Sequence, residues 1–206
     1  MPLYKEWNIG AHALAAIWKI EEPEAFFQEQ TQIATDIRND RRRIEHLAGR
    51  YLLRHLKEDF PLFAIGKDEH DKPRLSNNEF FFSISHSWPY VAAVIDPHSE
   101  AGIDIQTWHP NIERIKHKFL SPREQELLSD DPRMLTLAWA AKEAAYKWNG
   151  KRGVDFIDHL PIDFFNVKEN NYEIMINFKL STLPQIIFIE NIITTDFACC
   201  YVSNVD

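Results

Sequence analysis

Residues 101–106 read Ala-Gly-Ile-Asp-Ile-Gln, an alternation that predicts a β-strand with one apolar and one polar face. Because successive side chains of a strand point to opposite sides, the two isoleucines share one face, while Gly102, Asp104 and Gln106 share the other. A carboxylate and a carboxamide therefore stand two residues apart on one side of an otherwise apolar strand. A buried carboxylate needs a partner, so this pattern marks Asp104 as a candidate functional residue.

A second motif lies further along the chain, in a segment with the periodicity of a helix. Trp139, Glu143 and Tyr146 fall within roughly 60° of one another at 100° per residue, and Lys142 and Lys147 flank them. A carboxylate on a packed aromatic face is costly unless it is paired or metal-bound. Taken alone, Glu143 and Lys147 also fit an ordinary i,i+4 ion pair, and Asp104 also fits an acid in a turn or edge strand.

The bulk composition indicates a folded protein of one large or two small domains. The chain has 206 residues, of which 45% are hydrophobic, and its net charge of -8 argues against a general nucleic-acid-binding surface. The two adjacent cysteines make a poor structural disulfide, which favours a reducing, cytoplasmic location. The beginning of the chain lacks a signal-peptide pattern, and the apolar residues 185–193 are too short and too polar to predict a membrane span.

Both halves of the sequence mix helical and strand patterns, which predicts the α+β fold class, with one half in residues 1–98 and the other in residues 99–206. In the first half, residues 1–20 favour a strand and residues 23–60 favour helix. Two short strands follow, interrupted near residues 85–89.

Two further expectations concern strand pairing and helix ends. The turn at residues 96–100 predicts a hairpin that pairs Val91–Ile95 with Gly102–Gln106. In the second half, helices are expected to begin at Ser121 and at Asp131, the latter ending at Asn149-Gly150. The remaining apolar segments, up to residue 202, predict strands joined by turns.

Arginines form a row along the helical segment of the first half. Arg43, Arg50 and Arg54 recur at i, i+7 and i+11 beside its apolar stripe. A solvated charged face is the simpler explanation. In a chain with a net negative charge, Arg43 and Arg50 are also candidate anion ligands.

Taken together, the two motifs resemble the paired signature of the 4'-phosphopantetheinyl transferases, (V/I)-G-(I/V)-D followed by W-x-x-K-E-x-x-x-K. Here they read GID at 102–104 and WAAKEAAYK at 139–147. Upstream, DKPRL, FSISHS and LAGRYLLR resemble further family segments, with Ser83 in place of the usual Asn. The resemblance runs from about residue 40 to 154. The length is similar to that of the larger, monomeric class, whose two α+β halves pack around a pseudo-twofold axis.

The resemblance implies transfer of the 4'-phosphopantetheine arm of coenzyme A to a serine of an apo acyl or peptidyl carrier protein, with release of adenosine 3',5'-bisphosphate. It implies that Asp104 and Glu143 hold Mg²⁺ and that Lys147 contacts the pyrophosphate, with Lys142 as a second phosphate contact. These residues would give the second half the metal-binding and catalytic role. The first half would contact the coenzyme A nucleotide through the residues that match family positions, Lys72, Ser85 and His86, and through Arg43 as a 3'-phosphate ligand.

Several alternatives stay open from the sequence. The base that deprotonates the serine is either Glu143 or a metal-bound water. Gln106 stands where many relatives carry a third acid, so one alternative is a weakened family member that binds coenzyme A or a carrier protein without turnover. A third hypothesis is an unrelated metal-dependent phosphohydrolase. The basic run Arg114, Lys116, His117 and Lys118 is a candidate carrier-docking patch, or a plain exposed segment.

Overall fold

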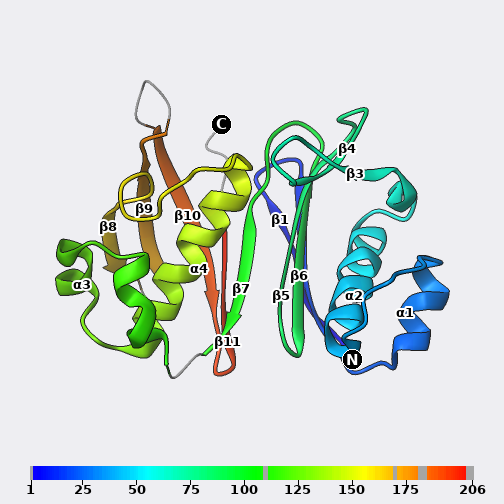
Figure 1. The fold of residues 1–206 in the computed structure, drawn as a ribbon, viewed down its shortest axis with the longest axis horizontal. Helices are drawn as coiled ribbons and strands as arrows, with labels where there is room; N and C mark the ends of the chain where they lie inside the picture. Colours follow the sequence, from blue (N-terminus) through cyan, green and yellow to red (C-terminus); the bar gives the residue numbers. More distant parts are fainter. Residues whose placement is uncertain (1, 109–110, 169–170, 181–184, 203–206) are drawn as a thin grey trace. The chain divides into compact units, whose positions relative to one another are not determined.

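The chain divides into two compact units, residues 1–101 and 102–206, each of which is described by itself. The computed structural model describes residues 2–108, 111–168, 171–180 and 185–202. Each unit contains an antiparallel sheet and a long helix packed against it (Figure 1). The predicted α+β fold class is therefore confirmed. None of the described helices combines the length and the apolar composition that a membrane span requires.

The first unit is built on a four-stranded sheet in the order β1-β2-β6-β5. The helix α2 packs on β6, β2 and β5, and buries Leu47, Leu52 and Leu53 beneath it. A short hairpin of β3 and β4 forms a separate two-stranded sheet. The elements are β1 (Leu3–Ile9), β2 (Ala13–Lys19), α1 (Glu24–Thr31), α2 (Asp40–Leu56), η1 (Leu62–Ala64), β3 (Ile65–Lys67), β4 (Pro73–Leu75), β5 (Phe81–Ser87) and β6 (Tyr90–Asp96).

The predicted helical region 23–60 contains two helices rather than one. The first, α1, ends at Gln32, whose backbone adopts the left-handed conformation with φ of 56°. The second, α2, begins after Asn39, whose side chain accepts a hydrogen bond from Arg42 N at 3.0 Å. The prediction of helix is therefore confirmed for Glu24–Thr31 and Asp40–Leu56 and is wrong for residues 32–39 and 57–60.

The expected hairpin between residues 91–95 and 102–106 is wrong. Strand β6 is hydrogen-bonded to β2 on one side and to β5 on the other, so it has no free edge for a further strand. Strand β7 (Ile103–Thr107) pairs instead with β11 (Phe197–Val202), which places Asp104 opposite Cys200. A partner almost a hundred residues away leaves no local signal in the sequence.

The second unit contains a five-stranded sheet in the order β7-β11-β10-β9-β8. The helix α4 lies along this sheet and contacts β11 and β7 most extensively (Figure 1). The inner face of the sheet and α4 share a core that includes Ile174, Ile176 and Leu135. Besides β7 and β11, the second unit contains η2 (Ile112–Lys118), α3 (Pro122–Leu128), α4 (Pro132–Asn149), β8 (Ile162–Val167), β9 (Tyr172–Phe178) and β10 (Gln185–Ile193).

The predicted helix ends in this unit are confirmed. Ser121 and Glu124 form a reciprocal capping box at the start of α3. The Asp131 side chain accepts a hydrogen bond from Arg133 N at 2.8 Å, with Pro132 as the first helical residue of α4. Gly150 ends the helix with φ of 70° and donates its N–H to Tyr146 O at 2.9 Å.

Gly102 allows β7 to approach α4 closely. A Cβ atom at this position would lie 2.1 Å from Ala144 O and 2.7 Å from the Cβ of Trp148. Backbone atoms of a helix cannot yield by such distances, so only glycine fits between the chain leading into β7 and the last turns of α4. Asp104, two residues later, is thereby held on the side of the strand that faces the helix.

We expect Gly102→Ala to push β7 away from α4 and to lower the free energy of unfolding by about 1–3 kcal/mol or more, as overpacking does in other cores. Urea denaturation measures this loss. Gly66→Ala is the matched control, because its added Cβ would meet nothing closer than Arg74 O at 4.0 Å. Equal stability of the Gly102→Ala and Gly66→Ala proteins would contradict the proposed close approach.

Candidate functional site

A buried carboxylate forms the centre of the candidate site in the second unit. Asp104 is only 2% exposed, and its two oxygens accept hydrogen bonds from two different side chains. The Lys147 ammonium lies 2.5 Å from Oδ1, and the Gln106 amide donates to Oδ2 at 2.8 Å. An amide at position 106 can donate this hydrogen bond to Asp104, whereas the ionised acid that many relatives carry there cannot.

Glu143 lies one turn before Lys147 on α4, and its environment differs from that of Asp104. Burial and, to a smaller extent, the nearby Asp104 carboxylate raise the pKa of Glu143 to about 7, against the opposing effect of Lys147. Among the described residues, none donates a hydrogen bond to Glu143 or forms an ion pair with it. The two carboxylates are therefore close enough to repel each other, and only one of them is directly paired.

This donor set fits a divalent cation. Mg²⁺ is commonly held by one or two protein carboxylates, with substrate phosphates and water as the remaining ligands. Across the described ranges, no group of three or more His, Cys, Asp and Glu side chains is arranged to hold a metal. Asp104 and Glu143 thus suit a metal shared with a phosphate-bearing substrate better than a closed structural site.

The family of the chain follows from its second half. The family model for the 4'-phosphopantetheinyl transferase superfamily matches residues 100–202, which is half of the chain. The chain belongs to the 4'-phosphopantetheinyl transferase superfamily. No curated protein matches the chain closely enough to count as a relative. Members of the superfamily typically use Mg²⁺ and coenzyme A, and the matched segment contains Asp104, Glu143 and Lys147.

Lys142, the residue before Glu143, lies away from the two carboxylates. Its side chain is 0% exposed, and its Nζ is 2.6 Å from Glu124 Oε1, 2.7 Å from Phe119 O and 2.8 Å from Phe156 O. Burial lowers the pKa of Lys142, and the adjacent Glu124 opposes that change. With all three N–H groups bound to protein oxygens, the ammonium has none left for a phosphate, so this geometry does not support the expected phosphate contact.

In the first unit, Lys72 belongs to an ionic network of the β3–β4 hairpin. Its Nζ lies 2.8 Å from Glu100 Oε2, and Arg74 Nη1 lies 2.6 Å from the other oxygen of Glu100. Arg74 also binds Asp68 at 2.8 Å. Lys72 is mostly buried here, and burial lowers the pKa of its ammonium. Any substrate that Lys72 binds therefore competes with Glu100.

Ser85 and His86 occupy adjacent positions on β5 and face opposite ways. Ser85 is buried, whereas His86 is exposed and its Nδ1 lies 3.3 Å from Glu45 Oε2 on α2. The helix α2 also brings His46 and Arg50 into the same neighbourhood. Burial lowers the pKa of His46 to about 4, and the charges of Arg50 and His86 add to the effect.

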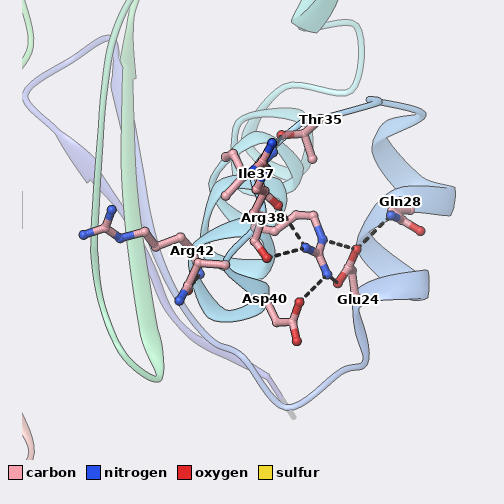
Figure 2. A network of polar contacts seen from close by, with 9 residues as sticks. Glu24, Gln28, Thr35, Ile37, Arg38, Asp40 and Arg42 are labelled. Carbon is pink, nitrogen blue, oxygen red and sulfur yellow. Dashed lines mark hydrogen bonds and ion pairs between the residues drawn. The ribbon is translucent and has the colours of Figure 1, made fainter.

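Arg43 does not lie with His46, Arg50 and His86, because its guanidinium binds residues at the start of the chain's helical region. Its Nε and Nη2 bind both oxygens of Glu24 at 2.7 and 2.8 Å, Nη2 binds Asp40 at 2.9 Å, and Nη1 donates to Ile37 O at 2.9 Å. Figure 2 shows Glu24 on α1 and Asp40 on α2 converging on this network. The paired carboxylates raise the pKa of Arg43. The guanidinium ties α1 to α2, which does not support its expected role as a phosphate ligand.

Arg50 is the other candidate anion ligand on α2, and the sequence analysis assigned the 3'-phosphate to Arg43 in its place. Burial lowers the pKa of Arg50, and it makes no ion pair with any residue in the described part of the chain. A partly buried guanidinium that makes no ion pair among the described residues is better placed to receive an anion than Arg43, which already binds Glu24 and Asp40. The sequence placed Arg43 and Arg50 on the same helix flank, and the spacing alone did not separate a structural arginine from an available one.

The raised pKa of Glu143 predicts a pH-dependent loss of stability. Between the unfolded value of 4.5 and about 7, the folded state keeps a proton that the unfolded state has lost, so rising pH favours unfolding. Relative to Glu143→Gln, the metal-free wild type should lose about 3 kcal/mol of unfolding free energy across this window. Urea denaturation at pH 4.5 to 8 with a chelator measures it. The exposed Glu126→Gln serves as the control, and parallel pH curves for wild type and Glu143→Gln would refute the raised pKa.

Proposed function

We propose that this chain transfers the 4'-phosphopantetheine arm of coenzyme A to a serine of an apo carrier protein in a Mg²⁺-dependent reaction. Membership of the superfamily suggests this class of transferase activity. The observation that carries the proposal is the cluster of Asp104, Glu143 and Lys147 on β7 and α4, within the matched segment. Two carboxylates and a lysine at a buried site supply what phosphoryl transfer requires, namely positioning and neutralisation of negative charge.

Asp104 and Glu143 are the residues that would hold Mg²⁺, which supplies charge neutralisation at the pyrophosphate when it is bound. In the proposed reaction, the serine oxygen forms a bond to the β-phosphorus while the bond from that phosphorus to the bridging oxygen breaks. Adenosine 3',5'-bisphosphate leaves with the electron pair of the broken bond. Lys147, which has an exposed fraction of 26%, would exchange its contact with Asp104 for the charge that develops on the leaving phosphate.

We propose that Glu143 is the general base that accepts the proton of the serine hydroxyl. Without a bound cation the pKa of Glu143 is raised to about 7, and a bound cation would favour the ionised form, so the carboxylate can accept a proton at neutral pH. Its carboxylate has two oxygens, so holding the cation and accepting a proton are compatible. Gln106 supports this chemistry by donating to Asp104 Oδ2 at 2.8 Å, which fixes the orientation of that carboxylate.

The nucleotide of coenzyme A is assigned to the first unit. Lys72, Ser85 and His86 match family positions for this role, and Arg50, near His46 on α2, adds a partly buried cation that has no ion pair among the described residues. The carrier protein is assigned to the basic residues of η2. Arg114, His117 and Lys118 are exposed there, while Lys116 pairs with Asp130. An exposed basic segment on a chain with net charge -8 suits an acidic partner. A monomeric state and a cytoplasmic location stay predictions.

The decisive experiment incubates the protein with coenzyme A, Mg²⁺ and a panel of apo carrier proteins, and detects the added phosphopantetheine by intact mass. We expect at least one carrier to be modified and transfer to stop when the metal is chelated. Asp104→Asn and Glu143→Gln should each lower kcat by about 100-fold or more, because each removes charge aimed at the reacting phosphate. The exposed Glu126→Gln should match wild type. Coenzyme A binding without modification of any carrier would favour the binding-only alternative.

A second prediction separates the two arginines of α2. Arg50→Ala should raise the KM for coenzyme A by about 10–100-fold, the cost of losing a hydrogen bond between charged groups. Arg43→Ala should lower the melting temperature by loosening α1 from α2 and leave that KM unchanged. Steady-state kinetics and thermal melting of both variants test the assignment. A raised KM in Arg43→Ala with an unchanged KM in Arg50→Ala would reverse it.

A further inference from the structure

Lys142 and Glu124 form a buried ion pair that the proposed chemistry does not use. The Lys142 side chain is 0% exposed and that of Glu124 is 2% exposed, and their charged atoms lie 2.6 Å apart. Removing two charges from water is costly, and apolar residues of similar volume often stabilise a protein as well or better. A contribution to stability therefore does not by itself explain why this pair is buried here.

The contacts of the two side chains join several segments of the second unit. Besides Glu124, Lys142 binds the carbonyl of Phe119 after η2 and the carbonyl of Phe156 in the segment after α4. Glu124 Oε2 accepts from Ser121 N at 2.7 Å at the start of α3, and Oε1 accepts from Ile162 N at 2.9 Å at the start of β8. One pair thus connects α4 to four neighbouring stretches of chain.

Aromatic rings surround the same anchor point. The Trp139 ring packs on Phe119 with centroids 5.0 Å apart and on Phe156 with centroids 5.5 Å apart, so both residues that receive Lys142 through their carbonyls also contact α4 through their rings. The side of α4 that carries Lys142 is consequently held both by the hydrogen bonds of the Lys142 ammonium, which are directional, and by aromatic packing.

Neighbouring residues on a helix point about 100° apart, so fixing Lys142 also fixes the direction of Glu143. Apolar packing alone tolerates small rotations of a helix about its axis, whereas three hydrogen bonds to one ammonium do not. The contact of Gly102 with Ala144 and Trp148 sets how closely α4 approaches β7. Lys142 then sets how α4 is turned at that distance.

We propose that Lys142 and Glu124 are positioning residues that fix the rotation of α4, and thereby the placement of the Glu143 carboxylate relative to Asp104. This inference rests on the proposed function, since it gives the placement of Glu143 a catalytic purpose. It assigns no phosphate contact to Lys142.

The test compares Lys142→Met/Glu124→Gln, which removes both charges and keeps both volumes, with Leu135→Ala. Leu135 is a buried core residue of α4 that takes no part in the ion pair or the hydrogen bonds of Lys142 and Glu124. Three quantities are measured: cooperative thermal melting, kcat and KM for coenzyme A, and the affinity for Mn²⁺ by electron paramagnetic resonance. Transfer is assayed at a temperature where every variant is folded.

We expect the double variant to melt cooperatively, to keep its KM for coenzyme A, and to lose about 100-fold in kcat, because small misplacements of a reacting group are that costly. Its Mn²⁺ affinity should fall by about tenfold, as with other changes that support a metal ligand. Leu135→Ala should lose stability and keep kcat and Mn²⁺ affinity.

Two results would overturn the inference. One is a folded double variant that keeps wild-type kcat and Mn²⁺ affinity, and the other is an equal loss of both in Leu135→Ala. If the double variant does not fold, Lys142→Met replaces it with the same expectations, because Glu124 then still accepts hydrogen bonds from Ser121 N and Ile162 N. If the wild type modifies no carrier, the proposed function fails, and Mn²⁺ affinity, measured without a carrier, still decides whether the pair positions Glu143.

Discussion

The contact between Gly102 and α4 is the constraint on which the rest of the second unit depends. Without a side chain at this position, the backbone entering β7 lies against Ala144 O and Trp148. The alternation of the strand then directs Asp104 toward the helix, and the spacing of the helix directs Glu143 and Lys147 toward the strand. A close backbone approach thus brings together groups that lie about forty residues apart in the sequence.

Charge balance in the second unit explains why this site suits a cation. Asp104 is paired with Lys147, and Glu124 is paired with Lys142. Glu143 is the carboxylate of this group that has no cation of its own among the described residues, and its pKa rises accordingly. The protein stabilises two of its buried carboxylates internally and leaves the third to be neutralised by a proton or by a bound ion.

Local features of the fold were predictable from the sequence, and nonlocal ones were not. The start of α3 and both ends of α4 followed from Ser121, Asp131 and Gly150, because caps are local interactions. The pairing of β7 was wrong, because turn residues after β6 suggested a hairpin whereas the partner strand lies at the end of the described chain.

The same division applies to the candidate site. The faces of Asp104 and Glu143 followed from the periods of strand and helix. The partners of Lys142 and Arg43 could not be predicted in this way. A charged side chain that binds a ligand and one that pairs within the fold have the same sequence pattern, and only the position of the neighbouring segments distinguishes them. Arg43 pairs with Glu24 and Asp40, whereas Arg50 pairs with no carboxylate among the described residues, and no spacing within one helix reveals this difference.

The alternation of β11 separates the two adjacent cysteines. Cys200 lies in the core between the sheet and α4, opposite Asp104, while Cys199 belongs to the other face of the strand, and both are fully buried. Burial raises the pKa of Cys200, which suppresses its thiolate. Alkylating reagents would therefore react with Cys200 only when β11 separates from β7, the strand that carries Asp104. The rate at which Cys200 is modified therefore measures how often this part of the sheet opens.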